Sequence, residues 1–103
     1  MLTCIIRYEI EPFQRAEFET YAETWAAAIP AAGANLIGYF SPREGTATTA
    51  YGLYEIADLA AYEAYRARLA GSPEGAQNYA FAAQNRFIRR EDRAFYHRIG
   101  GPQ

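Results

Sequence analysis

The stretch that decides the fold is Leu36-Ile37-Gly38-Tyr39-Phe40, which Ser41-Pro42-Arg43-Glu44-Gly45 connects to a second run from Thr49 to Ile56. Both runs are rich in aliphatic and aromatic residues, and the Pro and Gly between them are typical of a β-hairpin connection. Each face of the hairpin carries apolar side chains, whereas a strand with one side in water alternates apolar with polar residues. We therefore expect cover on both faces, from the chain's own helices on one and from a second copy of the molecule on the other.

Simple alternation assigns the side chains of the first run to two faces. Leu36 and Phe40 point to one face, and Ile37 and Tyr39 point to the other. Together with Ile5 from the first strand, Ile37 and Tyr39 would form an apolar patch on the sheet face that the helices leave bare. Because a monomer rarely leaves such a patch in water, we predict homodimerisation through the sheet faces into a dimeric α/β barrel.

The segments before the hairpin predict a strand and a long helix. Residues 2–10 alternate, and their core side consists of Leu2, Cys4, Ile6, Tyr8 and Ile10. The helix is expected from about Pro12 to Ile29, because Pro suits a first helical position and Gly33 suits a stop. Its apolar residues recur at helical spacing and form one buried stripe of Phe18, Tyr21, Ala22, Trp25 and Ile29.

The segments after the hairpin predict two more helices and a last strand. Asp58 is a good N-cap for a helix from Leu59 to Ala70, and Ser72-Pro73 begins a third helix. The inner stripe of the second helix is expected to consist of Leu59, Tyr62, Arg66 and Leu69, with Tyr65 beside it. The third helix should bury a narrow face of Ala76, Tyr79, Ala80 and Ala83. A strand from about Phe87 to Arg98 follows.

The resulting order, β-α-β-β-α-α-β, predicts an α+β protein with a ferredoxin-like fold. Its simplest arrangement is a four-stranded antiparallel sheet in the strand order 4-1-3-2, with the helices on one face. We expect a single domain over residues 1–99 and a C-terminal tail over residues 100–103.

Composition excludes several classes of function. The chain has 103 residues and a formal net charge of −2, which provides no basic surface for nucleic acid. All its cations are Arg, so a lysine nucleophile and a lysine-linked pyridoxal phosphate are excluded, and we expect no cofactor. The one Cys, Cys4, lies in an apolar run. No signal peptide and no run of about 20 apolar residues is present, so we expect a cytoplasmic protein without membrane contact.

Several segments together resemble the NIPSNAP family. Ile6-Arg7-Tyr8-Glu9-Ile10, followed by Pro12 and Phe18, is similar to the opening of that family. Gly38-Tyr39-Phe40 with the downstream Glu44-Gly45 is similar to its second strand and turn.

The resemblance continues through the second half of the chain. The segment from Asp58 to Arg66, with Leu69 and Ser72-Pro73-Glu74, is similar to the family's second helical segment. The resemblance implies a dimeric α/β barrel and no generally established activity. Many members have a histidine-containing segment before the Gly-Tyr-Phe block, whereas this chain has Asn35-Leu36-Ile37, so a role tied to that histidine is not carried over.

No pattern for metal binding or nucleophilic catalysis stands out. His97 is the only histidine, and one histidine does not make a metal site; it is either a surface residue or a general base. Ser41 and Ser72 occupy turn and cap positions rather than a nucleophile elbow. The glycines form neither a phosphate loop nor a dinucleotide fingerprint.

The aromatic residues form the more suggestive set. Tyr8, Trp25, Tyr39 and Tyr51 come from strands and a helix, and we predict that they line a small cavity between the first helix and the sheet. Such groups orient an aromatic ligand in an apolar cavity. The alternative is a Tyr-rich core that has Tyr in place of Phe and Leu.

Arginines crowd the last segment, which contains Arg86, Arg89, Arg90, Arg93 and Arg98. One interpretation is cross-strand ion pairs, such as Arg89 or Arg93 with Glu9, and Arg7 with Glu91. The other is that one Arg, for which we take Arg89, binds a carboxylate or enolate at the cavity mouth. The predicted ligand-binding residues are therefore Tyr8, Trp25, Asn35, Tyr39, Tyr51 and Arg89.

Three functions are compatible with these patterns. The first is a homodimeric NIPSNAP-like protein that binds a small hydrophobic or aromatic molecule between sheet and helices. The second is a cofactor-independent monooxygenase or cyclase acting on an aromatic substrate, by analogy of fold, with Asn35, Trp25 and an Arg to hold an enolate. The third is a non-catalytic interaction module. A cavity large enough for a ligand would favour the first two, and a filled core would favour the third.

Overall fold

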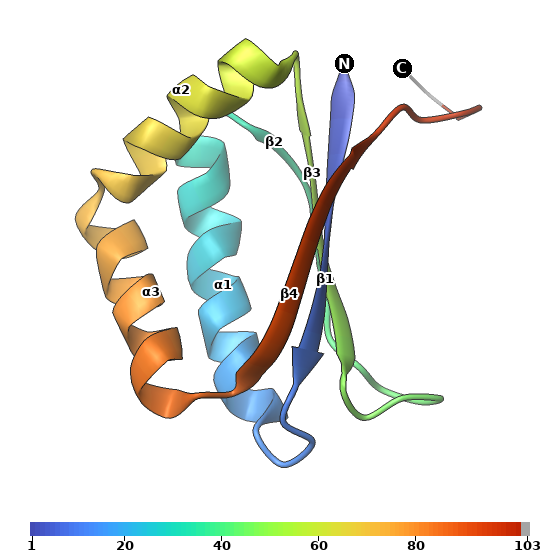
Figure 1. The fold of residues 1–103 in the computed structure, drawn as a ribbon, viewed down its shortest axis with the longest axis vertical. Helices are drawn as coiled ribbons and strands as arrows, with labels where there is room; N and C mark the ends of the chain where they lie inside the picture. Colours follow the sequence, from blue (N-terminus) through green and yellow to red (C-terminus); the bar gives the residue numbers. More distant parts are fainter. Residues whose placement is uncertain (102–103) are drawn as a thin grey trace.

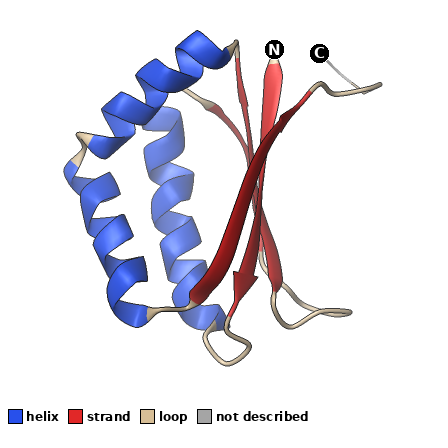
Figure 2. Cartoon of the chain, in the orientation of Figure 1, coloured by secondary structure: helices blue, strands red, loops and turns tan. Residues whose placement is uncertain are grey.

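The computed structural model describes residues 1–101 and has the expected order of elements (Figures 1 and 2). These are β1 (Leu2–Ile10), α1 (Arg15–Ala31), β2 (Asn35–Phe40), β3 (Thr49–Ile56), α2 (Leu59–Ala70), α3 (Pro73–Asn85) and β4 (Ile88–Tyr96). The four strands form one antiparallel sheet in the order β2-β3-β1-β4, which is the predicted ferredoxin-like arrangement. Part of the predicted tail, residues 102–103, lies outside the described residues.

The molecule has two layers, because α1, α2 and α3 all cover the same face of the sheet (Figure 1). The hydrophobic core lies between the layers, and β1 provides its centre with Cys4, Ile6, Tyr8 and Ile10, as the alternation predicts. From α1 the core receives the predicted stripe, Phe18, Tyr21, Ala22, Trp25 and Ile29. The opposite face of the sheet has no helix over it among the described residues, and we call it the helix-free face.

A β-bulge changes the predicted orientation of β2. The pairing of β2 with β3 shifts between Leu36 and Gly38, so Ile37 is an extra residue in the ladder. Because an extra residue reverses the alternation beyond it, Tyr39 joins Leu36 against the core, and Phe40 joins Ile37 among the exposed residues. The prediction that Tyr39 shares the bare face with Ile37 is therefore wrong, and Phe40 lies there instead.

The helix-free face nevertheless carries an apolar band. Its members come from all four strands and are half-buried or exposed: Ile5, Ile37, Phe40, Tyr51, Leu53 and Tyr96. Ion pairs within the chain lie beside this band, with Arg7 Nη2 at 2.9 Å from Glu9 Oε1 and Arg90 Nε at 3.1 Å from Asp92 Oδ2.

The helix boundaries follow local capping chemistry. In α1 the first helical residue is Arg15 rather than Pro12, because residues 11–14 form a turn in which the Gln14 N–H donates to the Glu11 carbonyl. The helix continues through Pro30 to Ala31. The starts of α2 and α3 are as predicted: Asp58 accepts from the Ala61 N–H and Ser72 from the Gly75 N–H.

The faces of α2 and α3 differ from the predicted ones by small rotations. In α2 Leu59 is exposed, whereas Tyr65 and Leu69 are buried. In α3 the predicted Tyr79 face lies at the surface, and the buried residues are Gly75 and Asn78. The Asn78 amide donates to the Tyr21 carbonyl across 2.9 Å, so a buried hydrogen bond fixes α3 against α1.

Candidate functional site: an aromatic cleft between sheet and helices

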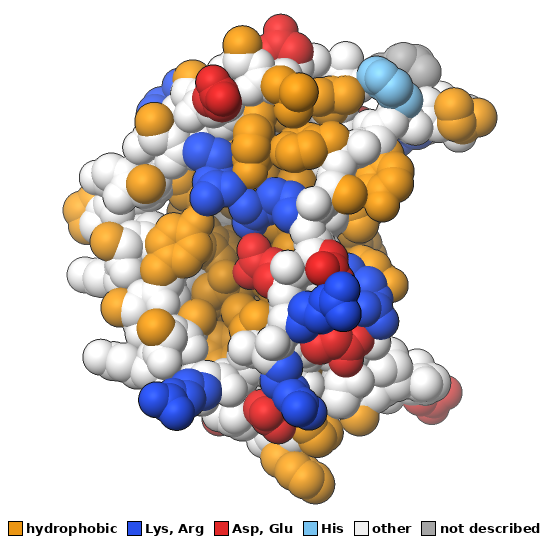
Figure 3. Space-filling model, in the orientation of Figure 1, with side chains coloured by type: hydrophobic (Ala, Val, Ile, Leu, Met, Phe, Trp, Pro, Cys, Tyr) orange, Lys and Arg blue, Asp and Glu red, His pale blue; other side chains and the backbone are white. Residues whose placement is uncertain are grey.

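A cleft between the sheet and the helices collects aromatic side chains from both layers. Its tyrosines are Tyr8, Tyr21, Tyr39, Tyr54, Tyr65 and Tyr79, and Trp25 lies among them. Two arginines, Arg66 of α2 and Arg93 of β4, complete its polar lining, and no Asp or Glu of the described residues lines it. We call this site the aromatic cleft. Figure 3 looks toward the opening between α3 and β4, where charged side chains lie at the edge of an apolar hollow.

The rings of the cleft pack edge to face or tilted, as quadrupolar rings prefer. Tyr8 lies at the centre, with ring centroids 6.3 Å from Tyr21 and 6.2 Å from Tyr39. The Tyr8 and Tyr39 hydroxyl oxygens are 3.4 Å apart. Trp25 contacts Tyr21 at 5.7 Å and the half-exposed Tyr79 at 5.0 Å, so Tyr79 separates the indole from solvent.

Burial keeps five of the six phenols of the cleft in their neutral form. Desolvation raises the pKa of Tyr21 and of Tyr65 to about 12, and it raises the pKa of Tyr8, Tyr39 and Tyr54 well above the usual value. At neutral pH these hydroxyls can therefore donate or accept hydrogen bonds but carry no charge. The charge of the cleft comes from its two arginines.

The two arginines converge on one hydroxyl. Arg66 Nη1 donates to the Tyr62 hydroxyl at 2.6 Å, and Arg93 Nη1 donates to the same oxygen at 3.3 Å. Arg93 Nη2 also pairs with Glu91 Oε2 at 3.0 Å. Arg93 faces the core because it lies opposite Ile6 in the β1–β4 ladder. The α2 helix brings Tyr62 and Arg66 together because they are four residues apart.

The aromatic cleft is narrow. Its cavity volume is about 20 Å³, which is enough for one water molecule. Sites for drug-sized molecules usually hold roughly 300–1,000 Å³. The rings of the cleft therefore nearly fill it, and a ligand would have to displace side chains at the mouth.

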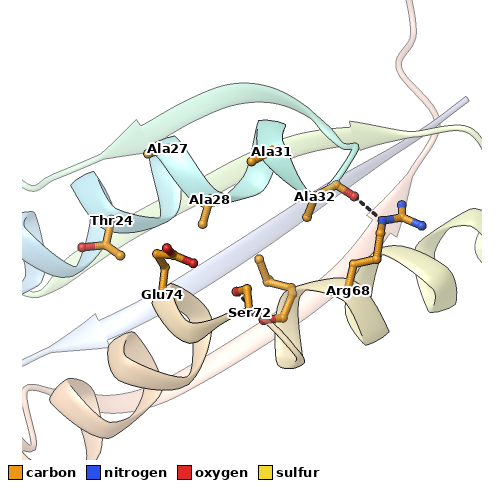
Figure 4. A pocket seen from close by; sticks show the side chains of 9 residues that line it. Thr24, Ala27, Ala28, Ala31, Ala32, Arg68, Ser72 and Glu74 are labelled. Carbon is orange, nitrogen blue, oxygen red and sulfur yellow. Dashed lines mark hydrogen bonds between the residues drawn. The ribbon is translucent and has the colours of Figure 1, made fainter.

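A second, larger hollow of about 430 Å³ lies between the C-terminal half of α1 and the junction of α2 with α3 (Figure 4). Its walls are mostly alanine methyl groups, with Thr24, Arg68, Ser72 and Glu74 at its edges. Arg68 Nε donates to the Ala32 carbonyl at 2.7 Å and so caps the end of α1. Ser72 caps α3, and the Thr24 hydroxyl donates to the Thr20 carbonyl of its own helix. Because these polar side chains already serve the helices and most of the wall is alanine, this hollow has less specific chemistry than the aromatic cleft.

The structure brings together half of the predicted site residues. Tyr8, Trp25 and Tyr39 share the aromatic cleft. Tyr51 does not, because Ala50 and Gly52 face the core and Tyr51 points to the helix-free face. Asn35 is exposed at the start of β2, where its amide donates to Glu55 Oε1 at 3.0 Å. The predicted place of Tyr51 and Asn35 beside the cleft is wrong.

Arg89 also lies away from the cleft. The β1–β4 ladder pairs Glu9 with Arg90 and Ile10 with Ile88, so Arg89 is the extra residue of a bulge. Its side chain is 66% exposed and approaches Glu11 Oε1 at 3.6 Å. The predicted ion pairs with Glu9 are likewise wrong, because Arg7, on the same strand, takes that carboxylate.

The predicted site lacked both arginines of the cleft, Arg66 and Arg93, and the Tyr62 hydroxyl that they share. It also lacked four of the lining tyrosines: Tyr21, Tyr54, Tyr65 and Tyr79. An Arg in the apolar stripe of α2 was the available signal for Arg66. No such signal existed for Arg93, whose direction depends on the strand register.

The described residues provide neither a metal site nor a membrane-spanning helix. The described residues contain no group of three or more His, Cys, Asp and Glu side chains that could hold a metal ion, and His97 is exposed just beyond β4. No helix within residues 1–101 has both the length and the apolar character needed to cross a membrane.

The NIPSNAP family model matches residues 3–99. The chain belongs to the NIPSNAP family. An uncharacterised NIPSNAP-like domain protein from Burkholderia xenovorans has a similar structure, with a TM-score of 0.83 and 22% identity over 99% of this chain and 89% of that one. No curated protein matches the chain.

Two other solved structures have a fold similar to that of this NIPSNAP chain, and one of them is not named as a NIPSNAP protein. A NIPSNAP family protein from Agrobacterium tumefaciens has a TM-score of 0.76 and 22% identity, over 95% of this chain and 92% of that one. A putative antibiotic biosynthesis monooxygenase from Nitrosomonas europaea has a TM-score of 0.73 and 9% identity, over 97% and 100% of the two chains. At these identities the likeness concerns the fold alone.

Proposed function

We propose that this NIPSNAP protein binds a small hydrophobic or aromatic molecule in the aromatic cleft and acts as a homodimer. The observation that carries the binding proposal is the convergence of Trp25 and six tyrosines, from both layers, on one cleft. A core that only needed volume would be served by Leu and Phe, which bring no hydroxyl to desolvate. The neutral phenols provide donors and acceptors that orient a ligand in apolar surroundings.

Opening of the mouth is part of the proposal, because the cavity of about 20 Å³ holds no more than a water molecule. Tyr79 is 41% exposed and covers Trp25, so rotation of its side chain would admit a ligand to the indole. Rotamer changes of half-exposed side chains are fast and cost little.

The occupant proposed for the helix-free face is a second copy of the chain. The apolar band includes Phe40 at 51% and Tyr51 at 37% exposure, and a stable dimer commonly buries about 800 Å² per partner. The charges beside the band are neutralised within one chain by the Arg7–Glu9 and Arg90–Asp92 pairs. A twofold axis could therefore bring two such faces together without placing unpaired charges of the same sign against each other.

Trp25 is the only Trp of the chain, so its indole N–H gives one signal that reports on the cleft. The test is to titrate ¹⁵N-labelled protein with a panel of two- and three-ring aromatic compounds and to analyse solvent extracts of the purified protein by mass spectrometry. We expect saturable shifts of the indole signal for part of the panel. Tyr79→Ala should speed association, whereas the matched variant Tyr96→Ala on the helix-free face should not. An indole signal unmoved by every compound, with no compound extracted, would contradict the binding proposal.

A second candidate function is the non-catalytic interaction module, which the nearly filled cleft favours. It predicts no ligand in the test above.

The oxygenase alternative requires Asn35, Trp25 and an Arg to hold an enolate, but Asn35 lies away from Trp25 and the cleft. Oxygen consumption with anthrone- or quinol-like compounds is the measurement that tests it.

A further inference from the structure

We infer that the aromatic cleft selects molecules that carry an anionic oxygen, a carboxylate or an enolate-type oxygen, and that Arg93 and Arg66 hold this group. The inference rests on the proposed function and adds the class of ligand. The sign of the charge follows from the lining, which among the described residues contains two arginines and no acidic side chain. The buried phenols can orient an oxygen but are neutral, so the guanidinium groups supply the electrostatic selection.

Arg93 has an unused donor in this site. Its Nη1 and Nη2 donate to Tyr62 and Glu91, but its Nε is buried and lacks a hydrogen-bond partner within the described part of the chain. Buried donors of native proteins are nearly always paired, and an unpaired one is costly. An anionic oxygen in the cleft would accept from this N–H and remove that cost.

Arg66 brings a second positive charge to the same place. Its Nη1 and Arg93 Nη1 both donate to the Tyr62 hydroxyl, so two like charges meet at one hydroxyl oxygen. Among the described residues Glu91 is the one carboxylate paired with Arg93, which leaves an excess of one positive charge. An incoming carboxylate would balance that excess, and the planar guanidinium groups suit its geometry.

The position of Tyr62 makes this pair a formed site rather than two mobile side chains. Its ring packs edge to face on Phe95 of β4 at 4.7 Å, and the Arg66 guanidinium carbon is 5.7 Å from the ring centroid. Tyr62 thereby holds both arginines at the junction of α2 and β4, on the same side of the sheet as the aromatic rings. A ligand can then place its ring among the tyrosines and its anionic oxygen against Arg93.

The test compares two probes of almost equal shape, 2-naphthoate and its neutral amide 2-naphthamide, by isothermal titration calorimetry. A charge-assisted hydrogen bond to a guanidinium is worth enough to make naphthoate bind at least about tenfold more tightly than the amide. Arg93→Gln and Arg66→Gln should each reduce this preference, because losing a guanidinium charge weakens the binding of naphthoate more than that of the neutral amide. Arg89→Gln is the matched control on the same strand, and it should keep the full preference.

The outcomes separate this inference from the proposed function. Equal binding of both probes to the unmodified protein would leave the binding function standing and overturn the anion selectivity. A preference that survives in both Gln variants would also overturn it. If neither probe binds, no compound of the panel moves the Trp25 indole signal and no compound is extracted, the binding function is overturned and the inference with it. Thermal unfolding of each variant checks its fold, and Arg66→Gln decides the question if Arg93→Gln does not fold.

Discussion

Tyr39 lies directly over Gly52, its partner in the β2–β3 ladder, so closely that a Cβ on Gly52 would come within 2.6 Å of the Tyr39 ring. The glycine thus makes room for a tyrosine that the bulge turns toward the core. The same ring faces Tyr8 across the cleft, with hydroxyl oxygens 3.4 Å apart. The absence of a Cβ at Gly52 therefore lets the Tyr39 ring occupy its place in the cleft.

Gly52→Ala should destabilise the protein, because the added methyl group overlaps the Tyr39 ring. Overpacking of this kind costs about 1–3 kcal/mol in the free energy of unfolding, which urea titration would measure. Gly71→Ala is the matched control, since its nearest contact would be at 3.4 Å and its backbone is helical. In Tyr39→Ala protein the same Gly52 substitution should have little effect, and equal losses in both backgrounds would contradict the overlap.

Asn78→Ala should also destabilise the protein, since it removes the buried hydrogen bond from the Asn78 amide to the Tyr21 carbonyl. We expect a loss of about 1–3 kcal/mol in the free energy of unfolding. The neighbouring Gln77 is exposed, so Gln77→Ala should change it by less than about 0.5 kcal/mol. Equal effects of the two substitutions would show that the hydrogen bond between α1 and α3 contributes nothing.

Stability should fall at alkaline pH because of the buried phenols. Their pKa is raised in the folded state, so the folded protein holds protons that the unfolded chain releases above about pH 10. The stabilisation from Tyr21 and Tyr65 is complete below about pH 10 and is lost as the pH rises to about 12, by about 1.4 kcal/mol per pH unit for each group. Urea titrations between pH 8 and pH 11.5 measure this slope. The fall of stability with pH should be less steep for Tyr21→Phe, and an unchanged slope would show that the Tyr21 phenol does not contribute to it.

The proposed dimer predicts opposite behaviour for two exposed phenylalanines. Phe40→Glu places a charge in the apolar band of the helix-free face and should give a monomer at micromolar concentration in size-exclusion chromatography with light scattering. Phe13→Glu makes the same change at a 98% exposed loop residue and should leave the dimer intact. A monomeric unmodified protein in that measurement would refute the dimer.

Much of the fold could be predicted because its signals are local. The alternation in residues 2–10, the Asp58 and Ser72 caps and the helix from Leu59 to Ala70 follow from neighbouring residues, and the strand order follows from the element order. The two bulges could not be predicted. They depend on which residue of the partner strand each residue meets, and simple alternation assumes perfect pairing.

The same limit explains the errors in the candidate site. Trp25 and Tyr8 were predictable because their faces follow from unbroken periodicity in α1 and β1. Arg89 was misplaced because it is the extra residue of the β4 bulge, and Arg93 was missed because its direction depends on pairing with Ile6. The error for Tyr51 has a simpler reason: the period of two in β3 places Tyr51 on the opposite face from Gly52 and Tyr54, and the aromatic character of its side chain does not change that face.

The one-sided helix cover of the sheet has a consequence for stoichiometry. Along β1, Tyr8 faces the cleft while Arg7 and Glu9 face the other way, so adjacent residues belong to separate surfaces. In the proposed pair of subunits the two clefts would open outward in opposite directions, with both sheets between them. Each subunit would then fill independently, and a saturation curve for the pair would show two equivalent, non-cooperative sites.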